Sequence, residues 1–413
     1  MCDLIVQGNY PLNGTINIQG SKNAALCLIA GSLAIRKKVI LNNIPLLTDV
    51  CDFLEILKKL NVTYKFIEKH SLLLDSSEIK NTSLILDEVK KFRASYYLIG
   101  ALLPYFKKIE INYPGGCNFS KRPIDIHLKM FKDYGAEYIE SNHLDFEFKS
   151  YKNYEITLKN ISFGATVNAI LMGLYAKKKV IIENVSKEIE IDCLIEFLNK
   201  SGGNIKRKDN KIIIQECLFK DVIFDNIPDR MEIGTFAFIA ATRGKLTLYP
   251  IIRDHIKYLE DIFNQLGIVY YFVQNSLVIE QSSVKKNLII QTGEYPMFPT
   301  DLQPILTAYL TTVKRIHLIK ETIYNQRFSH VQELKKMGAS IYVEDGTLLI
   351  NGIFDIHGNT VYAHDLRCAA ALLISSLNAN GETRINNASI ISRGYENIFE
   401  KLQSIGAHIE VIQ

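Results

Sequence analysis

The most unusual stretch of the sequence is a loop with a single cysteine, Tyr-Pro-Gly-Gly-Cys-Asn-Phe-Ser-Lys-Arg-Pro over residues 113–123. Proline and the paired glycines predict an exposed turn, in which Cys117 lies close to the cations Lys121 and Arg122. Neighbouring positive charge favours the thiolate, which is the reactive form of cysteine. Two interpretations stay open for this stretch alone: a reactive thiol, or a surface turn with an incidental cysteine.

A second chemical feature is a lysine at the predicted start of a buried helix. Ser21-Lys22-Asn23 precedes an apolar run that reaches Leu33. A lysine in the first helical turn opposes the helix dipole, whereas the N–H groups there bind phosphates, to which a lysine adds a direct charge. The pattern indicates either an anion site or a solvated lysine behind a serine cap.

Four further arginines lie beside apolar or turn residues: Arg93, Arg327, Arg367 and Arg393. Each alone is typical of a salt bridge at a helix end. Together with the cations already named they indicate a small, strongly anionic ligand, because a guanidinium matches a carboxylate or phosphate with two parallel hydrogen bonds.

Asp301 follows a proline-constrained loop and precedes an apolar helix. Its position alone fits an N-cap, whose carboxylate accepts hydrogen bonds from the first backbone N–H groups of the helix. Among the arginines, the same carboxylate would serve as a general base. Both interpretations stay open at this point.

The elements that must position these residues recur about every 70 residues. In each copy a lysine-rich or glycine turn leads into a short strand, and a helix follows that ends at a residue suited to left-handed backbone. The six stops are Asn61, Gly135, Gly202, Gly267, Gly338 and Gly406. Each copy predicts a strand, a helix, a short hairpin and a second helix. In the hairpin of residues 340–350, Asp345-Gly346 predicts a two-residue turn.

Six copies in 413 residues fit two lobes of three, with a break expected near residues 226–230. The stretches 21–33 and 366–377 are apolar on nearly all sides, which predicts buried central helices. Residues 3–20 predict a strand without a partner in the first copy, and we expect it to pair in the C-terminal lobe.

Composition excludes several classes of protein. Hydrophobic residues make up 47% and charged residues 22%, which excludes a disordered chain. A net charge of +4 without a long basic block does not indicate a nucleic-acid partner. The longest apolar run, residues 24–35, is too short to span a bilayer, and the N-terminus lacks a signal-peptide pattern. The seven scattered cysteines lack a C-x-x-C pair, so we expect a reducing cytosol. The histidines lack metal-ligand spacing and the sequence contains no G-x-G-x-x-G motif, so we expect neither a metal nor a dinucleotide cofactor.

Ten ordered motifs run from end to end of the chain, at residues 20–25, 92–95, 114–117, 122–127, 162–166, 229–235, 298–303, 327–330, 365–367 and 392–396. Through them the chain resembles the UDP-N-acetylglucosamine 1-carboxyvinyltransferases, also called enolpyruvyl-UDP-GlcNAc synthases. The resemblance implies an α/β fold of two lobes, each with three βαβαββ repeats, that forms an inside-out α/β barrel. It implies lobes of residues 21–228 and of residues 1–20 plus 229–413, a mobile Cys117 loop in the first lobe, and an active site in the cleft between them.

The resemblance also implies the reaction: enolpyruvate passes from phosphoenolpyruvate to the 3′-hydroxyl of UDP-GlcNAc and phosphate is released, in the first committed step of peptidoglycan synthesis. Cys117 would protonate C3 of phosphoenolpyruvate, and Asp301 would accept the proton of the hydroxyl. Phosphoenolpyruvate would be held at its phosphate by Lys22, Arg122 and Arg393, at its carboxylate by Arg327 and Arg367, and also by Asn23. The division of phosphate and carboxylate among the cations stays open. UDP-GlcNAc would contact Arg93, Arg122, Pro123, Ile124, Asp125, Ile126, Ser162, Phe163, Gly164, Asp301 and Ile323.

No metal or organic cofactor is implied, and the implied partners are the two substrates, without nucleic acid or membrane. The resemblance is to monomeric enzymes of the cytoplasm that the epoxide fosfomycin modifies at the loop cysteine. We expect the other six cysteines to react slowly, because they lie in apolar or strand contexts.

Three departures from the family pattern affect this interpretation. Asn160 stands where many members have a lysine near the diphosphate. Ser120 and Lys121 replace small residues after the loop cysteine. Met297 replaces a common glycine, which would restrict φ at that turn.

Two alternatives are weighed against this function. A 5-enolpyruvylshikimate-3-phosphate synthase shares the fold and the donor, but the Pro-Gly-Gly-Cys loop and the Arg-Pro-Ile-Asp-Ile-His stretch are typical of the nucleotide-sugar branch. A non-catalytic repeat protein that binds a nucleotide sugar would not need both Cys117 and Asp301.

Overall fold

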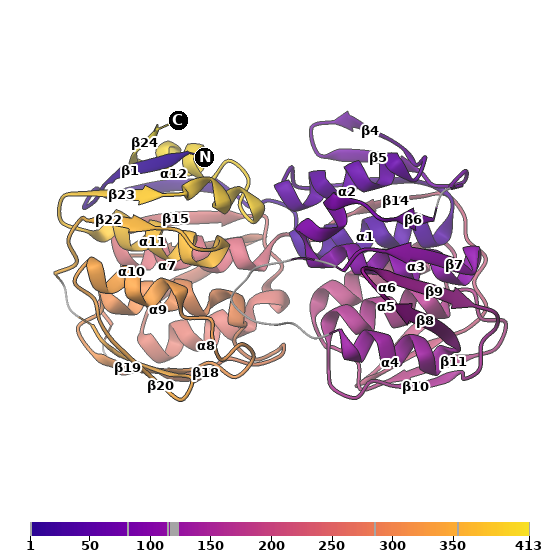
Figure 1. Ribbon diagram of the computed structural model, residues 1–413. Helices are drawn as coiled ribbons and strands as arrows, with labels where there is room; N and C mark the ends of the chain where they lie inside the picture. Colours follow the sequence, from indigo (N-terminus) through magenta and orange to yellow (C-terminus); the bar gives the residue numbers. More distant parts are fainter. Residues whose placement is uncertain are drawn as a thin grey trace. The chain divides into compact units, whose positions relative to one another are not determined.

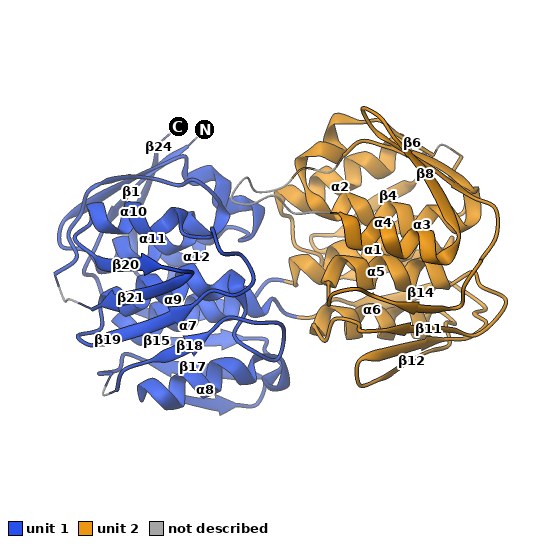
Figure 2. Cartoon of the chain, turned by 60° about the horizontal axis from the view of Figure 1, so that its bottom comes forward, with its two compact units in different colours: residues 1–19, 228–413 blue, residues 20–227 orange. Residues whose placement is uncertain are grey.

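The chain divides into two compact units in the computed structural model, which describes residues 2–80, 82–113, 115, 124–284, 286–352 and 355–412. Unit 1 comprises Met1–Gln19 and Pro228–Gln413, and unit 2 comprises Gly20–Ile227 (Figure 2). Each unit has a hydrophobic core of its own. The chain therefore passes between the units twice, after Gln19 and after Ile227.

The strands within the described ranges form six four-stranded sheets, three in each unit (Figure 1). Each sheet combines one parallel pair with two antiparallel pairings. In unit 2 the first sheet has the strand order β14 (Val222–Asp225), β3 (Lys38–Asn42), β5 (Ser71–Asp75), β4 (Thr63–Glu68). The second has the order β6 (Ser83–Leu84), β7 (Lys108–Ile111), β9 (Leu144–Phe148), β8 (Ala136–Glu140). The third has the order β10 (Glu155–Thr157), β11 (Val180–Glu183), β13 (Lys211–Ile214), β12 (Ile205–Lys208). In unit 1 the first sheet has the strand order β2 (Leu12–Asn17), β15 (Gly244–Tyr249), β17 (Ser276–Glu280), β16 (Val269–Val273). The second has the order β18 (Ile289–Gln291), β19 (Ile316–Lys320), β21 (Thr347–Asn351), β20 (Ser340–Glu344). The third has the order β22 (Thr360–Tyr362), β23 (Glu382–Asn386), β1 (Asp3–Gln7), β24 (His408–Ile412).

Helices fill the interior of each unit and the sheets surround them, so the inside-out α/β arrangement is confirmed (Figure 1). Nearly every residue is buried in the central helices α1 (Lys22–Ile35), α3 (Tyr97–Phe106), α5 (Phe163–Gly173), α7 (Arg230–Arg243), α9 (Gln303–Thr311) and α11 (Leu366–Asn378). An exposed face remains on α2 (Thr48–Lys59), α4 (Asp125–Tyr134), α6 (Ile189–Lys200), α8 (Lys257–Leu266), α10 (Ser329–Lys336) and α12 (Ile398–Ser404). Among the described residues, no helix combines the length and the apolar composition needed to cross a membrane.

The predicted helix stops are confirmed in all six repeats. Asn61 has φ 60°, and the five glycines have φ between 74° and 108°. A side chain with a Cβ is strained in this left-handed region, whereas glycine, and to a lesser extent asparagine, adopts it readily. The hairpin turn is also confirmed, since Asp345 and Gly346 have φ 45° and 75° between β20 and β21.

The N-terminal segment pairs within unit 1, as expected, but the prediction of one strand is wrong. Strand β1 lies between β23 and β24, whereas β2 pairs in parallel with β15 in another sheet. The strand breaks at Asn9, whose φ is 69°, and at Pro11, which has no N–H for a ladder hydrogen bond. The two short strands therefore complete two different repeats.

A fully buried carboxyl group in α7 makes the stability of unit 1 depend on pH. Glu232 accepts hydrogen bonds from Lys401 Nζ and from the backbone N–H of Gln19, both at 2.7 Å. Burial raises the pKa of Glu232 to about 7, although Lys401 and the Gln19 N–H oppose this shift. Because the pKa of Glu232 is higher in the folded protein than in the unfolded chain, binding of its proton stabilises the fold. This stabilisation is complete below about pH 4.5, the ordinary pKa of a glutamate, and is lost as the pH rises through about 7.

We expect the unfolding free energy of the wild type to fall between pH 4.5 and 7.5, relative to that of Glu232→Gln, by up to about 3 kcal/mol. Denaturant unfolding of both proteins across this range measures the difference, in which the contributions of other titrating groups cancel. Parallel pH curves for the two proteins would contradict the assignment.

Candidate active site

Several of the candidate residues that the structure describes lie at the N-terminal ends of central helices. Lys22 begins α1, the 3₁₀ helix η2 (Arg93–Tyr96) leads directly into α3, and Ser162 caps α5. In unit 1, Asp301 lies in η4 (Thr300–Leu302) before α9, and Arg367 lies in the first turn of α11. Because the first N–H groups of a helix lack intrahelical partners and carry the positive end of the dipole, these positions favour anions.

In unit 1 the structure brings together one carboxylate and two arginines. The carboxylate oxygens of Asp301 accept hydrogen bonds from Arg327 Nη1 and from Arg367 Nη2, each at 2.7 Å. Both arginines are buried, with 5% and 6% exposure, whereas the Asp301 side chain is 28% exposed. Arg367 also donates to the hydroxyl of Tyr395 at 3.1 Å. An anion that reaches Asp301 therefore meets two preoriented guanidinium groups.

The ionisation of Asp301 follows from this geometry. Burial alone would raise the pKa of its carboxyl group, but the charges of Arg367 and Arg327 and their hydrogen bonds outweigh burial and hold the pKa well below its usual value of 3.8. The carboxylate is therefore ionised at neutral pH and is a weak base while both guanidinium groups remain on it.

The N-cap interpretation of Asp301 is wrong. Leu302 precedes α9 as its cap residue and Pro299 precedes η4, and the Asp301 carboxylate instead faces the arginines. The reason is tertiary, because an ion pair with two buried guanidinium groups competes with the N–H groups of the local turn.

A buried glutamate that the sequence did not single out supports the same cluster. Oε1 of Glu321 accepts the N–H groups of Ile323 at 2.8 Å and Tyr324 at 3.0 Å. Oε2 accepts the hydroxyl of Thr300 at 2.9 Å, and that hydroxyl in turn accepts from Arg327. Glu321 thus fixes the turn of the candidate residue Ile323 and links it to Arg327. A glutamate at the end of a strand gives no sequence signal for this role.

In unit 2, the serine cap predicted before Lys22 is confirmed, since Ser21 Oγ accepts the N–H of Ala24 at 3.3 Å. The lysine itself is not a solvated side chain. Its Nζ lies 3.0 Å from Asp49 Oδ2, and the two side chains are 14% and 8% exposed. The charge of Lys22 is therefore held at the helix start by a carboxylate from α2.

His127, in α4, contacts the segments of unit 2 that contain the candidate residues for binding UDP-GlcNAc. The N–H of Gly100 donates to Oδ1 of Asn168 at 3.0 Å, so the Asn168 amide turns its Nδ2 donor to His127 Nδ1 at 3.1 Å. The ring proton is thereby assigned to Nε2. Burial, together with the charge of Arg93, lowers the pKa of His127 to about 3, so the imidazole is neutral.

The His127 ring also packs against neighbouring candidate segments. Its centroid lies 5.7 Å from that of Tyr96, in the segment of Arg93, and a Cβ at Gly164 would lie 3.0 Å from its Cε1. Glycine at this position lets the start of α5 approach the imidazole. The helical spacing of His127 with Phe131 and Tyr134 on the buried face of α4 is the sequence signal that could have identified it.

The remaining candidates are distributed as follows. In unit 2, Asn23 follows Lys22 in α1, Phe163 and Gly164 begin α5, Arg93 begins η2, and Ile124 precedes α4, which begins with Asp125 and Ile126. In unit 1, Ile323 is exposed and Arg393 ends η5 (Ala388–Arg393). Cys117, Arg122 and Pro123 lie outside the described residues, as do Ser120 and Lys121. Of the other departures, Asn160 is exposed. The backbone of Met297 does not adopt a positive φ, so no glycine is required there.

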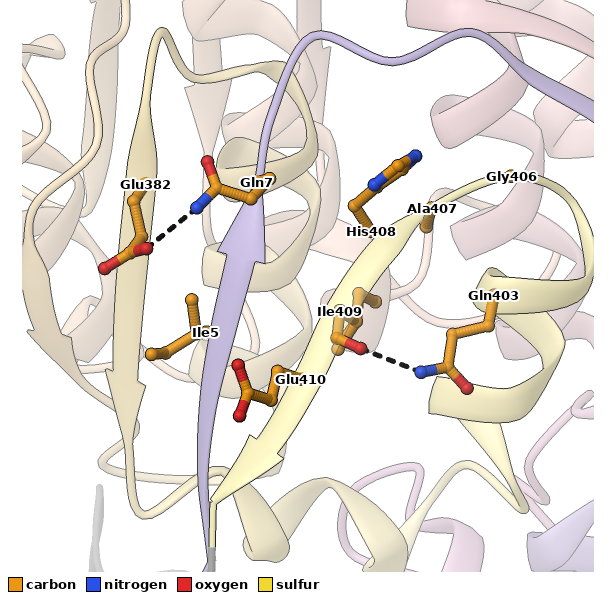
Figure 3. Close-up of a pocket in the computed structure, with 9 residues that line it drawn as sticks. All are labelled: Ile5, Gln7, Glu382, Gln403, Gly406, Ala407, His408, Ile409 and Glu410. Carbon is orange, nitrogen blue, oxygen red and sulfur yellow. Dashed lines mark hydrogen bonds between the residues drawn. The ribbon is translucent and has the colours of Figure 1, made fainter.

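A surface hollow in unit 1 contains none of these candidates. It lies over β1, β24 and the end of α12, where Gln7 donates to Glu382 at 2.7 Å and Gln403 donates to the carbonyl of Ile409 at 2.8 Å (Figure 3). Each of these two hydrogen bonds joins residues that line the hollow.

Comparison with known proteins extends over the whole chain. Residues 6–402 match the sequence profile of the family described as EPSP synthase (3-phosphoshikimate 1-carboxyvinyltransferase). The chain is 38% identical over 423 residues to the UDP-N-acetylglucosamine 1-carboxyvinyltransferase of Wolbachia sp. subsp. Brugia malayi (strain TRS), with 100% of both covered. It is also 38% identical to UDP-N-acetylglucosamine 1-carboxyvinyltransferase 2 of Staphylococcus aureus (strain MRSA252), with 98% of this chain and 97% of that one covered.

Two solved structures share the fold. The enolpyruvyl transferase NikO from Streptomyces tendae has a TM-score of 0.91 at 20% identity, over 99% of this chain and 98% of that one. EPSP synthase from Acinetobacter baumannii has a TM-score of 0.76 at 15% identity, over 100% of both chains. Since the identity to the curated relatives extends over the full length and the family profile spans nearly all of it, the chain belongs to the UDP-N-acetylglucosamine 1-carboxyvinyltransferases within the enolpyruvyl transferase family.

Proposed function

We propose that this enzyme transfers the enolpyruvyl group of phosphoenolpyruvate to the 3′-hydroxyl of UDP-GlcNAc and releases phosphate, as the first committed step of peptidoglycan synthesis. The observation that carries the proposal is the 38% identity to named UDP-N-acetylglucosamine 1-carboxyvinyltransferases over the whole chain. The two arginines on Asp301 support it, because the donor carries both a phosphate and a carboxylate.

In this proposal residues of both units bind the substrates. Arg327 and Arg367 hold the donor carboxylate, while Lys22, Arg122 and Arg393 hold its phosphate and Asn23 contacts it. The helix starts of unit 2, with Arg93 and the Ser162 cap, bind the nucleotide sugar. Support comes from the charge of these groups and from the affinity of helix N-termini for phosphate.

Substrate binding also changes the basicity of Asp301. In the free protein its oxygens each accept a hydrogen bond from a guanidinium group at 2.7 Å, which keeps its proton affinity low. A donor carboxylate that shares Arg327 and Arg367 draws their positive charge away from Asp301. The pKa of the aspartate then rises toward its ordinary value, and the carboxylate can accept a proton.

The proton balance assigns two roles. The sugar hydroxyl attacks C2 of phosphoenolpyruvate while its proton passes to Asp301, and Cys117 gives a proton to C3. The resulting adduct then loses the phosphate from C2 and returns a proton from C3 to the Cys117 thiolate, which restores the double bond in the product. Asp301 releases its proton to solvent. Each group thus exchanges a proton with one reacting atom.

The acceptor distinguishes this function from the alternatives. We expect phosphate release from phosphoenolpyruvate with UDP-GlcNAc and none with shikimate 3-phosphate. The reverse preference would identify a 5-enolpyruvylshikimate-3-phosphate synthase. Release with neither acceptor, combined with calorimetric binding of UDP-GlcNAc, would identify a non-catalytic nucleotide-sugar-binding protein.

Turnover is expected to continue without divalent metal ions. The arginines and Lys22 supply the positive charge that a metal ion would otherwise provide to the phosphate. Phosphate release should be undiminished after exhaustive chelation and exchange into metal-free buffer. An absolute requirement for an added divalent ion would contradict this role of the cationic side chains.

We also propose that the enzyme acts as a monomer in the cytoplasm. Two cytoplasmic metabolites as substrates and the free thiols of the described cysteines support the location. Light scattering at assay concentration, with a mass of 47.0 kDa expected, tests the monomer.

A further inference from the structure

Gln19, the last residue of unit 1 before the first passage to unit 2, makes four hydrogen bonds within unit 1. Its backbone N–H donates to Glu232 at 2.7 Å, and its carbonyl accepts the N–H of Asp229 at 2.9 Å. Its side-chain amide donates to the carbonyl of Gly394 at 2.8 Å and accepts the N–H of Glu396 at 2.7 Å. Since only 7% of Gln19 is exposed, these partners replace water almost completely.

The amide of Gln19 spans a turn that carries two groups of the candidate site. Its two partners, Gly394 and Glu396, lie on either side of Tyr395, and Gly394 directly follows Arg393. The Tyr395 hydroxyl accepts from Arg367 Nη1 at 3.1 Å and pairs with Thr235 at 2.8 Å. One side chain therefore fixes the backbone that places both Arg393 and the tyrosine partner of Arg367.

The backbone of Gln19 ties the same turn to the two passages between the units. Asp229, whose N–H donates to Gln19, follows the second passage and caps α7. Glu232, the acceptor of the Gln19 N–H, is held by Lys401 from α12. Gln19 is thus anchored at its backbone, so its amide reaches the turn from a fixed point.

We propose that Gln19 is a positioning residue for the phosphoenolpyruvate site, which orients Arg393 through the chain and Arg367 through Tyr395. This inference rests on the proposed function. A primary amide supplies a donor to one backbone group and an acceptor to another from two separate atoms, and asparagine is one methylene too short for this span.

Two nearly isosteric variants test the role. Gln19→Glu keeps the acceptor for Glu396 but sets a carboxylate oxygen against the carbonyl of Gly394, and Gln19→Met keeps the shape without either strong hydrogen bond. We expect the KM for phosphoenolpyruvate and the inhibition constant of inorganic phosphate to rise about tenfold, equivalent to about 1.4 kcal/mol. The KM for UDP-GlcNAc should stay unchanged.

Gln403→Met is the matched control, because Gln403 also donates to a backbone carbonyl of unit 1, at 2.8 Å, but lies at the surface hollow (Figure 3). All its constants should match the wild type. Unchanged KM for phosphoenolpyruvate in the Gln19 variants, or an equal rise in KM for both substrates, would overturn the inference. If the methionine variant lacks a thermal unfolding transition, Gln19→Glu decides the test. A wild type that fails to turn over the two substrates would contradict the proposed function instead.

Discussion

Replacing Asp301 with asparagine is expected to lower kcat by about 100- to 10,000-fold, the range for loss of a general base, without raising the KM for phosphoenolpyruvate. The variant keeps the shape of the side chain but cannot take the hydroxyl proton. It also removes the carboxylate that occupies Arg327 and Arg367 at 2.7 Å in the free protein, so the donor meets less competition for these cations. Steady-state kinetics with phosphoenolpyruvate varied measures both effects.

Asp3→Asn provides the control for Asp301. Asp3 is also ion-paired in unit 1, with Arg384 at 2.9 Å, but it lies in β1 and is not one of the candidate residues. Its variant should keep the wild-type kcat. If Asp301→Asn kept kcat and raised only the KM, Asp301 would be a binding residue and the base would have to be sought elsewhere.

Cys117→Ala is expected to lose most turnover, by about 100- to 10,000-fold, because nothing replaces the proton donor to C3. Cys117→Asp retains a group that can donate a proton and should keep measurable turnover. Since a carboxylate is not a soft nucleophile, this variant should escape modification by fosfomycin. Intact-mass spectrometry of the three proteins, with and without fosfomycin, should show one adduct on the wild type only.

The expected reactivity of the other cysteines decides which control the fosfomycin experiment needs. Burial raises the pKa of Cys193 and of Cys368 to about 12 and that of Cys27 well above 9.0, so these thiols should stay unmodified. The expectation that all six other cysteines lie in apolar or strand contexts is wrong for Cys51, which is exposed on helix α2. Cys51→Ala is therefore the matched control and should still form the adduct. An adduct on Cys51, or full activity of Cys117→Ala, would show that the loop cysteine lacks the proposed role.

The sequence by itself determined the features that depend on local backbone chemistry. The six helix stops could be predicted because glycine, and to a lesser extent asparagine, adopts left-handed backbone with less strain than other residues do. The central helices α1 and α11 were predictable because a segment that is apolar on all sides has to be buried. The motifs of the family could also be recognised in the sequence, because each is a short run of adjacent residues.

Only the tertiary structure decided which charges meet. Asp301 lies 26 positions from Arg327 and 66 from Arg367, and its local pattern alone favoured an N-cap. Likewise, the ion pair of Lys22 with Asp49 and the separation of β1 from β2 into two sheets depend on how the repeats pack. The physical reason is that ion pairs and strand ladders form between groups that the folded chain brings within a few ångströms, and sequence spacing does not encode that distance.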